Sequence, residues 1–138
     1  MVVERNLSKL LSGMDPVRNP GRYVFCTIRA SVVPSGLDPA ATLVEPEGLS
    51  IVVTQDNADA HGLTYQYVAA WITLRIHSAL DAVGLTAAFS TCLAENGISC
   101  NVVAGYYHDH LFVGIDDADR AVELLRGLAS ATGSTAAD

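Results

Sequence analysis

The second half of the chain carries an ordered alternation of strand and helix patterns, and this order restricts the fold more than any other feature. The β-rich run at 71–76 is followed by Gly84 and by a segment whose apolar residues recur every three or four positions, as on one face of a helix. Two more β-rich runs at 98–104 and 111–115 flank a short turn, and a last amphipathic helix is predicted at 118–128. This order predicts an α+β fold, with helices on one face of a mostly antiparallel sheet.

The first half of the chain repeats part of this order with weaker signals. Its β-rich runs lie at 23–28, 41–44 and 49–53. A short helix is predicted near the N-terminus, where Leu7, Leu10 and Leu11 form one stripe, and a second at 55–61 after a Thr54 cap. Residues 30–40 contain Pro34, Gly36 and Pro39 and are predicted to form a loop.

We interpret these patterns as two related units that share one extended sheet. The predicted division is a degraded N-terminal unit at 1–66, a C-terminal unit with clearer signals at 67–128 and a disordered tail at 129–138. An odd set of three cysteines without a CxxC motif is typical of reduced thiols, and the N-terminus lacks a signal-peptide pattern, so we expect a cytoplasmic protein.

The charge of the chain argues against two classes of partner. The net charge is −7, and the eight basic residues are scattered rather than clustered. Binding to nucleic acid or to an anionic membrane surface depends on clustered Lys and Arg, so neither partner is expected. No run approaches the roughly 20 apolar residues that a membrane helix needs.

Several short motifs resemble those of the ACT domain, a small regulatory module that binds amino acids at its βα loops. They are Gly84-Leu85 at the start of the predicted helix, Leu93 within it and Asn96-Gly97-Ile98-Ser99 at its end. The whole chain is similar to a bacterial family of small, free-standing ACT-domain proteins. The similar phrases are Tyr23-Val-Phe-Cys26, His77-Ser78, Ala82-Val83-Gly84-Leu85-Thr86 and the run from Asn101 to His110.

The resemblance implies a ferredoxin-like βαββαβ fold in each of two ACT-like units. It also implies a sensor or regulatory protein that binds a small molecule, most plausibly an amino acid, without catalysis and without a cofactor. An ACT unit normally ends with a fourth strand, which residues 129–138 do not provide. Either the N-terminal half supplies that strand or the edge is open to a partner chain, and we expect a homodimer.

The predicted ligand site lies around Gly84. A helix N-terminus presents unpaired N–H groups and a partial positive charge, and a glycine there lets a carboxylate approach the backbone. Thr86 adds a hydroxyl donor beside Leu85, and Asp81 can accept an ammonium group, so the set suits an α-amino acid. The alternative is that Gly84 only makes the tight turn into the helix.

The run His108-Asp109-His110 has two interpretations. As hydrogen-bonding residues of a hairpin turn, the histidines line the ligand site; as strand residues two apart, they and His77 form a metal or acid–base centre. We favour the first interpretation and expect no bound metal, and we keep a small enzyme or metal-binding protein as the alternative function. Asn101, on an otherwise apolar strand, either binds a loop backbone or reaches the ligand.

The remaining candidates are predicted to be structural. Cys92 and Cys100 fall on apolar stripes and are expected to be inert buried thiols rather than nucleophiles. Of the neighbouring Tyr106 and Tyr107, one is expected to pack in the core and the other to border a pocket or an interface.

Overall fold

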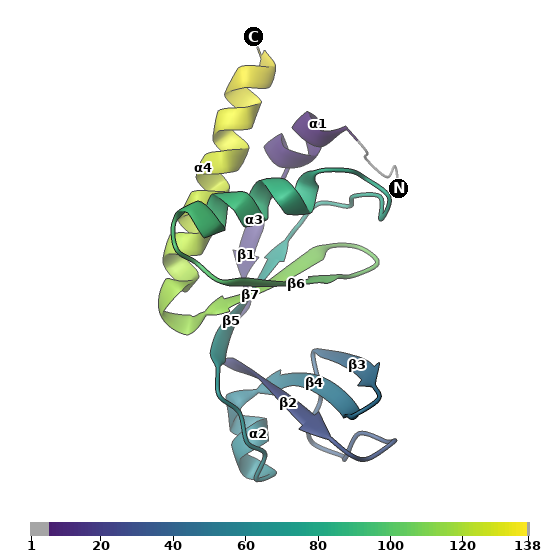
Figure 1. Ribbon diagram of the computed structural model, residues 1–138. Helices are drawn as coiled ribbons and strands as arrows, with labels where there is room; N and C mark the ends of the chain where they lie inside the picture. The colour runs from purple at the N-terminus through teal and green to yellow at the C-terminus, as the bar shows by residue number, and fades with distance from the viewer. Residues whose placement is uncertain (1–5, 138) are drawn as a thin grey trace. The chain divides into compact units, whose positions relative to one another are not determined.

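A computed structural model describes residues 6–137 and divides the chain into two compact units (Figure 1). We call Pro20–Ala70 the small unit, and Met1–Asn19 together with Trp71–Asp138 the large unit. This grouping differs from the expected split after residue 66, because the start of the chain packs with its second half. Residues 1–5 and 138, which belong to the predicted terminal segments, lie outside the described part.

The sheet of the large unit has the order β1-β5-β7-β6, and it is built around the last residues of β5. Its strands are β1 (Pro16–Arg18), β5 (Val68–Leu74), β6 (Cys100–Ala104) and β7 (Asp109–Gly114). Its helices are α1 (Leu7–Ser12), α3 (Leu85–Glu95) and α4 (Ala118–Ala137), the last preceded by the 3-10 turn η1 (Ile115–Asp117). From β5 onward, the unit therefore follows the β-α-β-β-α order predicted from the sequence, and the mixed α+β fold is confirmed.

The N-terminal segment supplies the fourth strand of the large unit. β1 pairs antiparallel with β5, with Pro16 opposite Leu74 and Arg18 opposite Ile72. The pairing is continued on both sides, where Arg75 N donates to the Asp15 carbonyl at 2.8 Å and Asn19 N to the Trp71 carbonyl at 2.8 Å. The first of the two predicted alternatives for the missing strand is therefore correct.

The core of the large unit lies between one face of this sheet and helices α3 and α4. The sheet contributes Ile72, Leu74, Leu111 and Val113, and the helices contribute Leu85, Phe89, Leu93, Ala118, Ala121 and Leu125, all of them buried. The predicted apolar stripes of both helices are thus confirmed. Asp116 and Asp117 lie in η1, directly before the first residue of α4.

Helix α4 continues to Ala137, through most of the segment expected to be disordered. Residues 129–137 contain no proline and several alanines, which have high helix propensity. Ala129 is buried, and the Thr132 hydroxyl donates to the Leu128 carbonyl at 2.9 Å. Burial of one face therefore extends the helix beyond the predicted end at Leu128.

The small unit has the strand order β3-β4-β2-β5, with all three pairings antiparallel. Its own elements are β2 (Tyr23–Ile28), β3 (Ala41–Glu45), β4 (Gly48–Thr54) and α2 (Gln55–Ala60), and the first residues of β5 complete the sheet. The predicted strands and the Thr54 cap are confirmed, since Thr54 Oγ1 accepts from Asn57 N at 3.2 Å. β5 thus contributes its first residues to this sheet and its last residues to the sheet of the large unit.

A loop between β2 and β3 stands where the large unit has helix α3. Pro34 and Pro39 prevent a continuous helix there. The loop nevertheless fills the core, because Leu37 is only 1% exposed and packs with Val24, Ile51 and the other buried residues of the unit. Helix α2 holds the loop in place, with Asn57 Nδ2 donating to the Leu37 carbonyl at 3.1 Å.

Candidate functional site

The junction between β5 and α3 has the backbone that the predicted site requires. Gly84 is the N-cap of α3 with φ of +98°, in the left-handed region that favours glycine. As the N-cap residue, Gly84 offers no side-chain acceptor, whereas Asn6 accepts from Lys9 N at the start of α1 and Thr54 accepts from Asn57 N at the start of α2. The first N–H groups of α3 therefore lack the N-cap oxygen that the other two helices have.

The missing side chain of Gly84 also has a packing role. A Cβ built at Gly84 would lie 3.1 Å from Leu7 Cδ2, so α1 packs directly against this turn. The alternative interpretation, in which glycine is needed for a tight turn, therefore describes the observed conformation. It does not conflict with ligand binding, because the backbone amides that follow Gly84 are a separate feature from its α-carbon.

The other residues predicted for this site divide into exposed and buried groups. Asp81 and Thr86 are exposed on either side of Gly84, whereas Leu85 is 4% exposed and belongs to the core. Gly84 also lines a hollow of about 580 Å³ between α3 and Leu128 of α4, formed mostly by small residues such as Ala87, Ala88 and Thr91. Of the predicted set, Asp81, Gly84 and Thr86 are placed where a ligand in solution can reach them.

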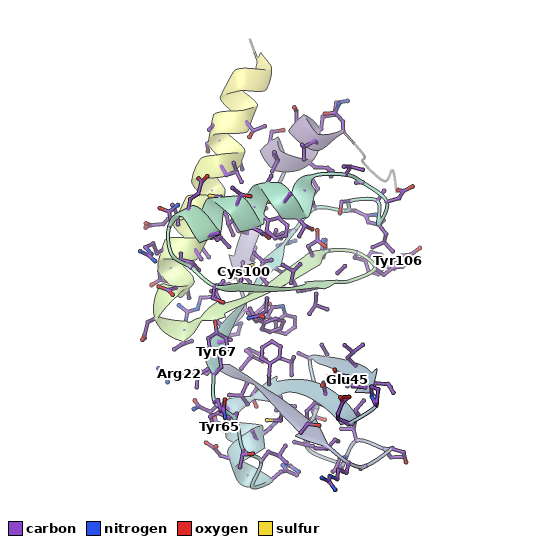
Figure 2. All side chains as sticks on the ribbon, in the orientation of Figure 1. Arg22, Glu45, Tyr65, Tyr67, Cys100 and Tyr106 are labelled. Carbon is purple, nitrogen blue, oxygen red and sulfur yellow. The ribbon has the colours of Figure 1, made fainter. Side chains whose placement is uncertain are left out.

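The tip of the β6–β7 hairpin lies beside the loop that follows β5. The His77 ring contacts those of Tyr106 and Tyr107, with centroid distances of 6.2 and 5.8 Å, and the two tyrosines meet edge to face at 5.0 Å. Tyr106 is 75% and Tyr107 57% exposed, and Tyr106 projects outward at the tip (Figure 2). The expectation that one tyrosine packs in the core is wrong, because both lie in the turn beyond the sheet.

His110 is held within the sheet rather than in a turn. Trp71 Nε1 donates to His110 Nδ1 at 3.0 Å, and the Thr73 hydroxyl lies 3.2 Å from the same nitrogen. Because an indole N–H is only a donor, Nδ1 must be unprotonated and the ring proton lies on Nε2. Burial lowers the pKa of His110, as does neighbouring His108, while Asp109 opposes this shift.

Asp109 differs from the prediction in its backbone setting, whereas His108 lies in the hairpin turn. The turn closes with Gly105 N donating to the His108 carbonyl at 2.9 Å, and β7 already begins at Asp109, opposite Ala104. Asp109 is therefore a strand residue, and burial raises the pKa of its carboxyl, while both neighbouring histidines oppose this. His108 Nδ1 is buried without a hydrogen-bond partner among residues 6–137.

Asn101 and the histidines were the other predicted site residues. Asn101 is exposed on β6, opposite Phe112. Within residues 6–137, no three His, Cys, Asp or Glu side chains are arranged to hold a metal ion. The structure thus groups His77 with the hairpin tip and His110 with Trp71, and it does not assemble a His77–His108–His110 centre.

The cysteines are placed where thiolate formation is unfavourable. Cys92 and Cys100 are half-buried, Cys26 is buried, and all three are free thiols. Burial raises the pKa of the Cys100 thiol to about 11 and raises the pKa of Cys92 and of Cys26. These directions agree with inert thiols rather than nucleophiles, although Cys92 and Cys100 are less buried than the sequence pattern suggested.

Sequence reasoning missed the side chains that fix His110. Asn19 Nδ2 donates to Thr73 Oγ1 at 2.9 Å and so orients the hydroxyl that faces the imidazole. The alternation along β5 places Trp71 and Thr73 on one face, and this could have been predicted from the sequence. Their position beside His110, however, depends on which strands pair, and short β1 gave no strand pattern of its own.

Two regions of the chain match the same protein family. Residues 3–70 and residues 66–127 each match the ACT domain. A Vibrio cholerae protein, described as of unknown function and as a possible transport protein, is 48% identical; the match covers 89% of this chain and 95% of that one, with a TM-score of 0.81. The chain therefore belongs to the ACT-domain family and carries two ACT domains in tandem, modules that typically bind ligands and regulate.

More distant structures share the fold alone. Aspartate kinase from Clostridium acetobutylicum is 10% identical, with 83% of this chain and 34% of that chain covered and a TM-score of 0.63. The ligand-free regulatory subunit of aspartate kinase from Thermus thermophilus is 8% identical, with 82% and 95% covered and a TM-score of 0.51. None of the curated proteins compared with the chain matches it significantly.

Proposed function

We propose that this protein is an amino-acid-binding regulatory or sensor protein whose ligand sits at the N-terminus of α3. The observation that carries the proposal is the uncapped start of α3, in a chain whose other two capped helices both use a side-chain oxygen. The ligand carboxylate takes the place of that oxygen, where N–H groups and the helix dipole favour an anion. The membership in the ACT-domain family supports a regulatory role.

The remaining groups of the site suit the rest of an α-amino acid. The exposed carboxylate of Asp81 receives the ammonium group, and the Thr86 hydroxyl adds a hydrogen bond. The ring contacts of His77 with Tyr106 and Tyr107 place the hairpin tip against the loop that leads to Gly84, and His108 follows Tyr107 in the same turn. We propose no catalytic role here, since His110 Nδ1 is engaged by Trp71 and the thiols are disfavoured as thiolates.

We also propose that the protein is a cytoplasmic homodimer, as ACT domains commonly dimerise. The sequence argument for a dimer, an open sheet edge, no longer applies to the large unit, because β1 pairs with β5. The support that remains is the exposed apolar edge strand β3, where Leu43 is 65% and Val44 85% exposed. No helix of residues 6–137 combines the length and apolar character needed to cross a membrane.

A thermal-shift screen of the twenty amino acids tests the proposed function. A ligand at a hundred times its dissociation constant adds about 2.7 kcal/mol to the free energy of unfolding, which is a readily measured shift. Asp81→Asn should lose most of the shift, whereas Asp116→Asn, an exposed control on η1, should keep it. A screen without any stabilising amino acid, or an unchanged response of Asp81→Asn, would contradict the proposed site.

A further inference from the structure

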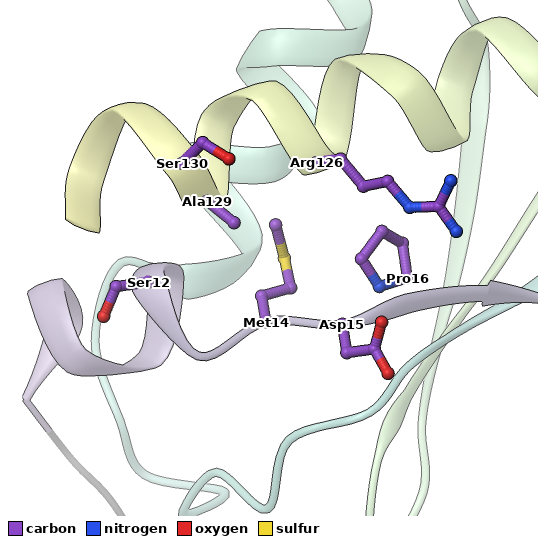
Figure 3. Close-up of a pocket in the computed structure, with 7 residues that line it drawn as sticks. All are labelled: Ser12, Met14, Asp15, Pro16, Arg126, Ala129 and Ser130. Atoms are coloured by element: carbon purple, nitrogen blue, oxygen red, sulfur yellow. The ribbon is translucent and has the colours of Figure 1, made fainter. Parts of the chain in front are cut away.

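A second hollow of the large unit, of about 610 Å³, lies between the α1–β1 segment and the later turns of α4 (Figure 3). It shares no lining residue with the hollow beside Gly84. Ser12, Met14, Asp15 and Pro16 line one side, and Arg126, Ala129 and Ser130 line the other. Its volume falls within the range of about 300–1,000 Å³ typical of small-molecule sites.

The two charged residues of this hollow have opposite signs and no side-chain partner within the part of the chain that the structure describes. The side chains of Asp15 and Arg126 form no hydrogen bond or ion pair with any residue of the described part. In Figure 3 both lie toward the same end of the hollow, with Pro16 between them. Elsewhere on β1 and α4 the charges do pair, as in Arg18–Asp119 at 3.1 Å and Arg120–Asp117 at 3.4 Å.

The backbone and the apolar floor of the hollow are firmly placed. The Asp15 carbonyl accepts from Arg75 N at 2.8 Å, which ties this residue to the strand ladder. Met14 is 4% and Ala129 8% exposed, and in Figure 3 the Met14 side chain rises toward Ala129. The charged groups are therefore carried by a strand start and a helix rather than by a loose loop.

We propose that this hollow binds the zwitterion of a free α-amino acid. The planar guanidinium of Arg126 takes the carboxylate through paired hydrogen bonds, and the carboxylate of Asp15 accepts from the ammonium group. The ligand side chain lies over Met14 toward the hydroxyls of Ser12 and Ser130. A ligand with only one of the two charges leaves either Asp15 or Arg126 without a partner, which selects against simple acids and amines.

This site is independent of the one proposed at the α3 N-terminus. It uses other residues on other elements, and it needs neither the glycine nor the helix dipole there. The large unit then holds two amino-acid sites, one near each end of α1. Leu7, at the start of α1, lies against Gly84, and Ser12, at its end, lines the second hollow.

A titration followed by backbone amide NMR tests the proposal on the full chain. The probes are L-serine, L-glutamine and L-methionine, each with its N-acetyl and its α-amide derivative. At least one free amino acid should shift the amides of residues 12–15 and 126–130, and blocking either its amine or its carboxylate should weaken binding at least tenfold. The proposal is overturned if no free amino acid shifts these amides, or if the blocked forms bind equally well.

Matched variants separate the charges from general surface effects. Asp15→Asn and Arg126→Gln should each weaken binding about tenfold or more, because the first removes the charged acceptor of the ammonium group and the second the paired donors to the carboxylate. Glu123→Gln, an exposed change on the same helix outside the hollow, should bind as the unchanged protein does. Equal affinity of all three variants would overturn the proposal.

The same spectra distinguish this site from the proposed function. Binding at the α3 N-terminus shifts the amides of residues 84–88 and is sensitive to Asp81→Asn, whereas binding in the second hollow is sensitive to Arg126→Gln. Shifts at 84–88 alone would overturn the second site and leave the first standing. Shifts at 12–15 and 126–130 alone would support the second site and contradict the first.

Discussion

The small and large units both build a sheet that includes residues of β5, but they cover that sheet with different elements. β5 contributes residues to the sheets of both units, and its pairings with β1 and with β2 are both antiparallel. The large unit covers its sheet with the two full helices α3 and α4, whereas the small unit has the six-residue α2 and a loop that buries Leu37. The strand order is thus compatible with quite different coverings, provided that apolar side chains fill the space above the sheet.

The difference also concerns helix starts. In the small unit, α2 begins at Thr54, whose hydroxyl caps the helix, while in the large unit α3 begins at uncapped Gly84. A capped start satisfies the backbone within the protein, and an uncapped start leaves it available to a ligand. In this comparison, α2 of the small unit only covers its sheet, whereas α3 of the large unit also offers the proposed ligand site.

The largest expected effect tests whether the β2–β3 loop stabilises the small unit as much as helix α3 stabilises the large one. Leu37→Ala in the loop and Leu93→Ala on α3 each remove a fully buried leucine, so each should lower the free energy of unfolding by about 2–5 kcal/mol. Urea denaturation measures both. Val32→Ala, at a side chain 76% exposed in the same loop, is the control and should change little. A small cost for Leu37→Ala beside a large one for Leu93→Ala would break the comparison.

A smaller effect is expected at the uncapped helix start. Gly84→Ala places a Cβ at φ of +98° and 3.1 Å from Leu7 Cδ2, so the unfolding free energy should fall by about 1–3 kcal/mol. Gly127→Ala lies on α4 with no atom within 4 Å of the new Cβ, and it should instead stabilise by about 0.5–1 kcal/mol. Thermal unfolding of both variants provides the test, and the same sign for both would show that backbone conformation does not govern Gly84.

The smallest expected effect is a pH dependence that belongs to the large unit. Because burial lowers the pKa of His110 in the fold, the unfolded chain binds its proton more readily, and stability falls as the pH drops below the ordinary value of about 6.5. The loss is complete below the folded pKa. His110→Gln keeps an acceptor for Trp71 but cannot titrate there, so its stability should fall less between pH 7.5 and 5.5.

The raised pKa of Asp109 changes stability with pH in the opposite direction. The pH profile of the unchanged protein must therefore be compared with that of His110→Gln. A carboxyl whose folded pKa is raised contributes stability at low pH that is lost as the pH rises above its ordinary range near 3.8. This change is present in both proteins and centres on more acidic conditions. Identical pH profiles for the unchanged protein and His110→Gln would mean that His110 is protonated as easily in the fold as in the unfolded chain.

Local patterns predicted most elements where side-chain periodicity is strong. The helix after Gly84, the β6–β7 hairpin and the Thr54 cap follow from residues within a few positions of one another, so their signals are complete in the local sequence. β1 was missed because three residues beginning with Pro16 have no detectable alternation, and the pairing with β5 is what makes them a strand. The extension of α4 was missed because burial of Ala129 is a tertiary contact.

The candidate sites show the same division. Asp81, Gly84 and Thr86 are neighbours in the chain, so the sequence could propose them together. The contact of His77 with the two tyrosines, the engagement of His110 by Trp71 and Thr73, and the meeting of Asp15 with Arg126 at one hollow all join residues far apart in the chain. No local pattern encodes such distances, and the turn interpretation of Asp109 failed because register decides where a strand begins.

The sequence by itself determined the α+β class, the two ACT-like halves and the glycine at which α3 begins, because these depend on periodicity, turn chemistry and backbone freedom within short segments. Only the tertiary structure decided which segment completes the large unit, what fills the missing helix position of the small unit and which charges remain unpaired. The physical reason is that strand pairing and burial depend on long-range contacts, which the whole chain must satisfy at once.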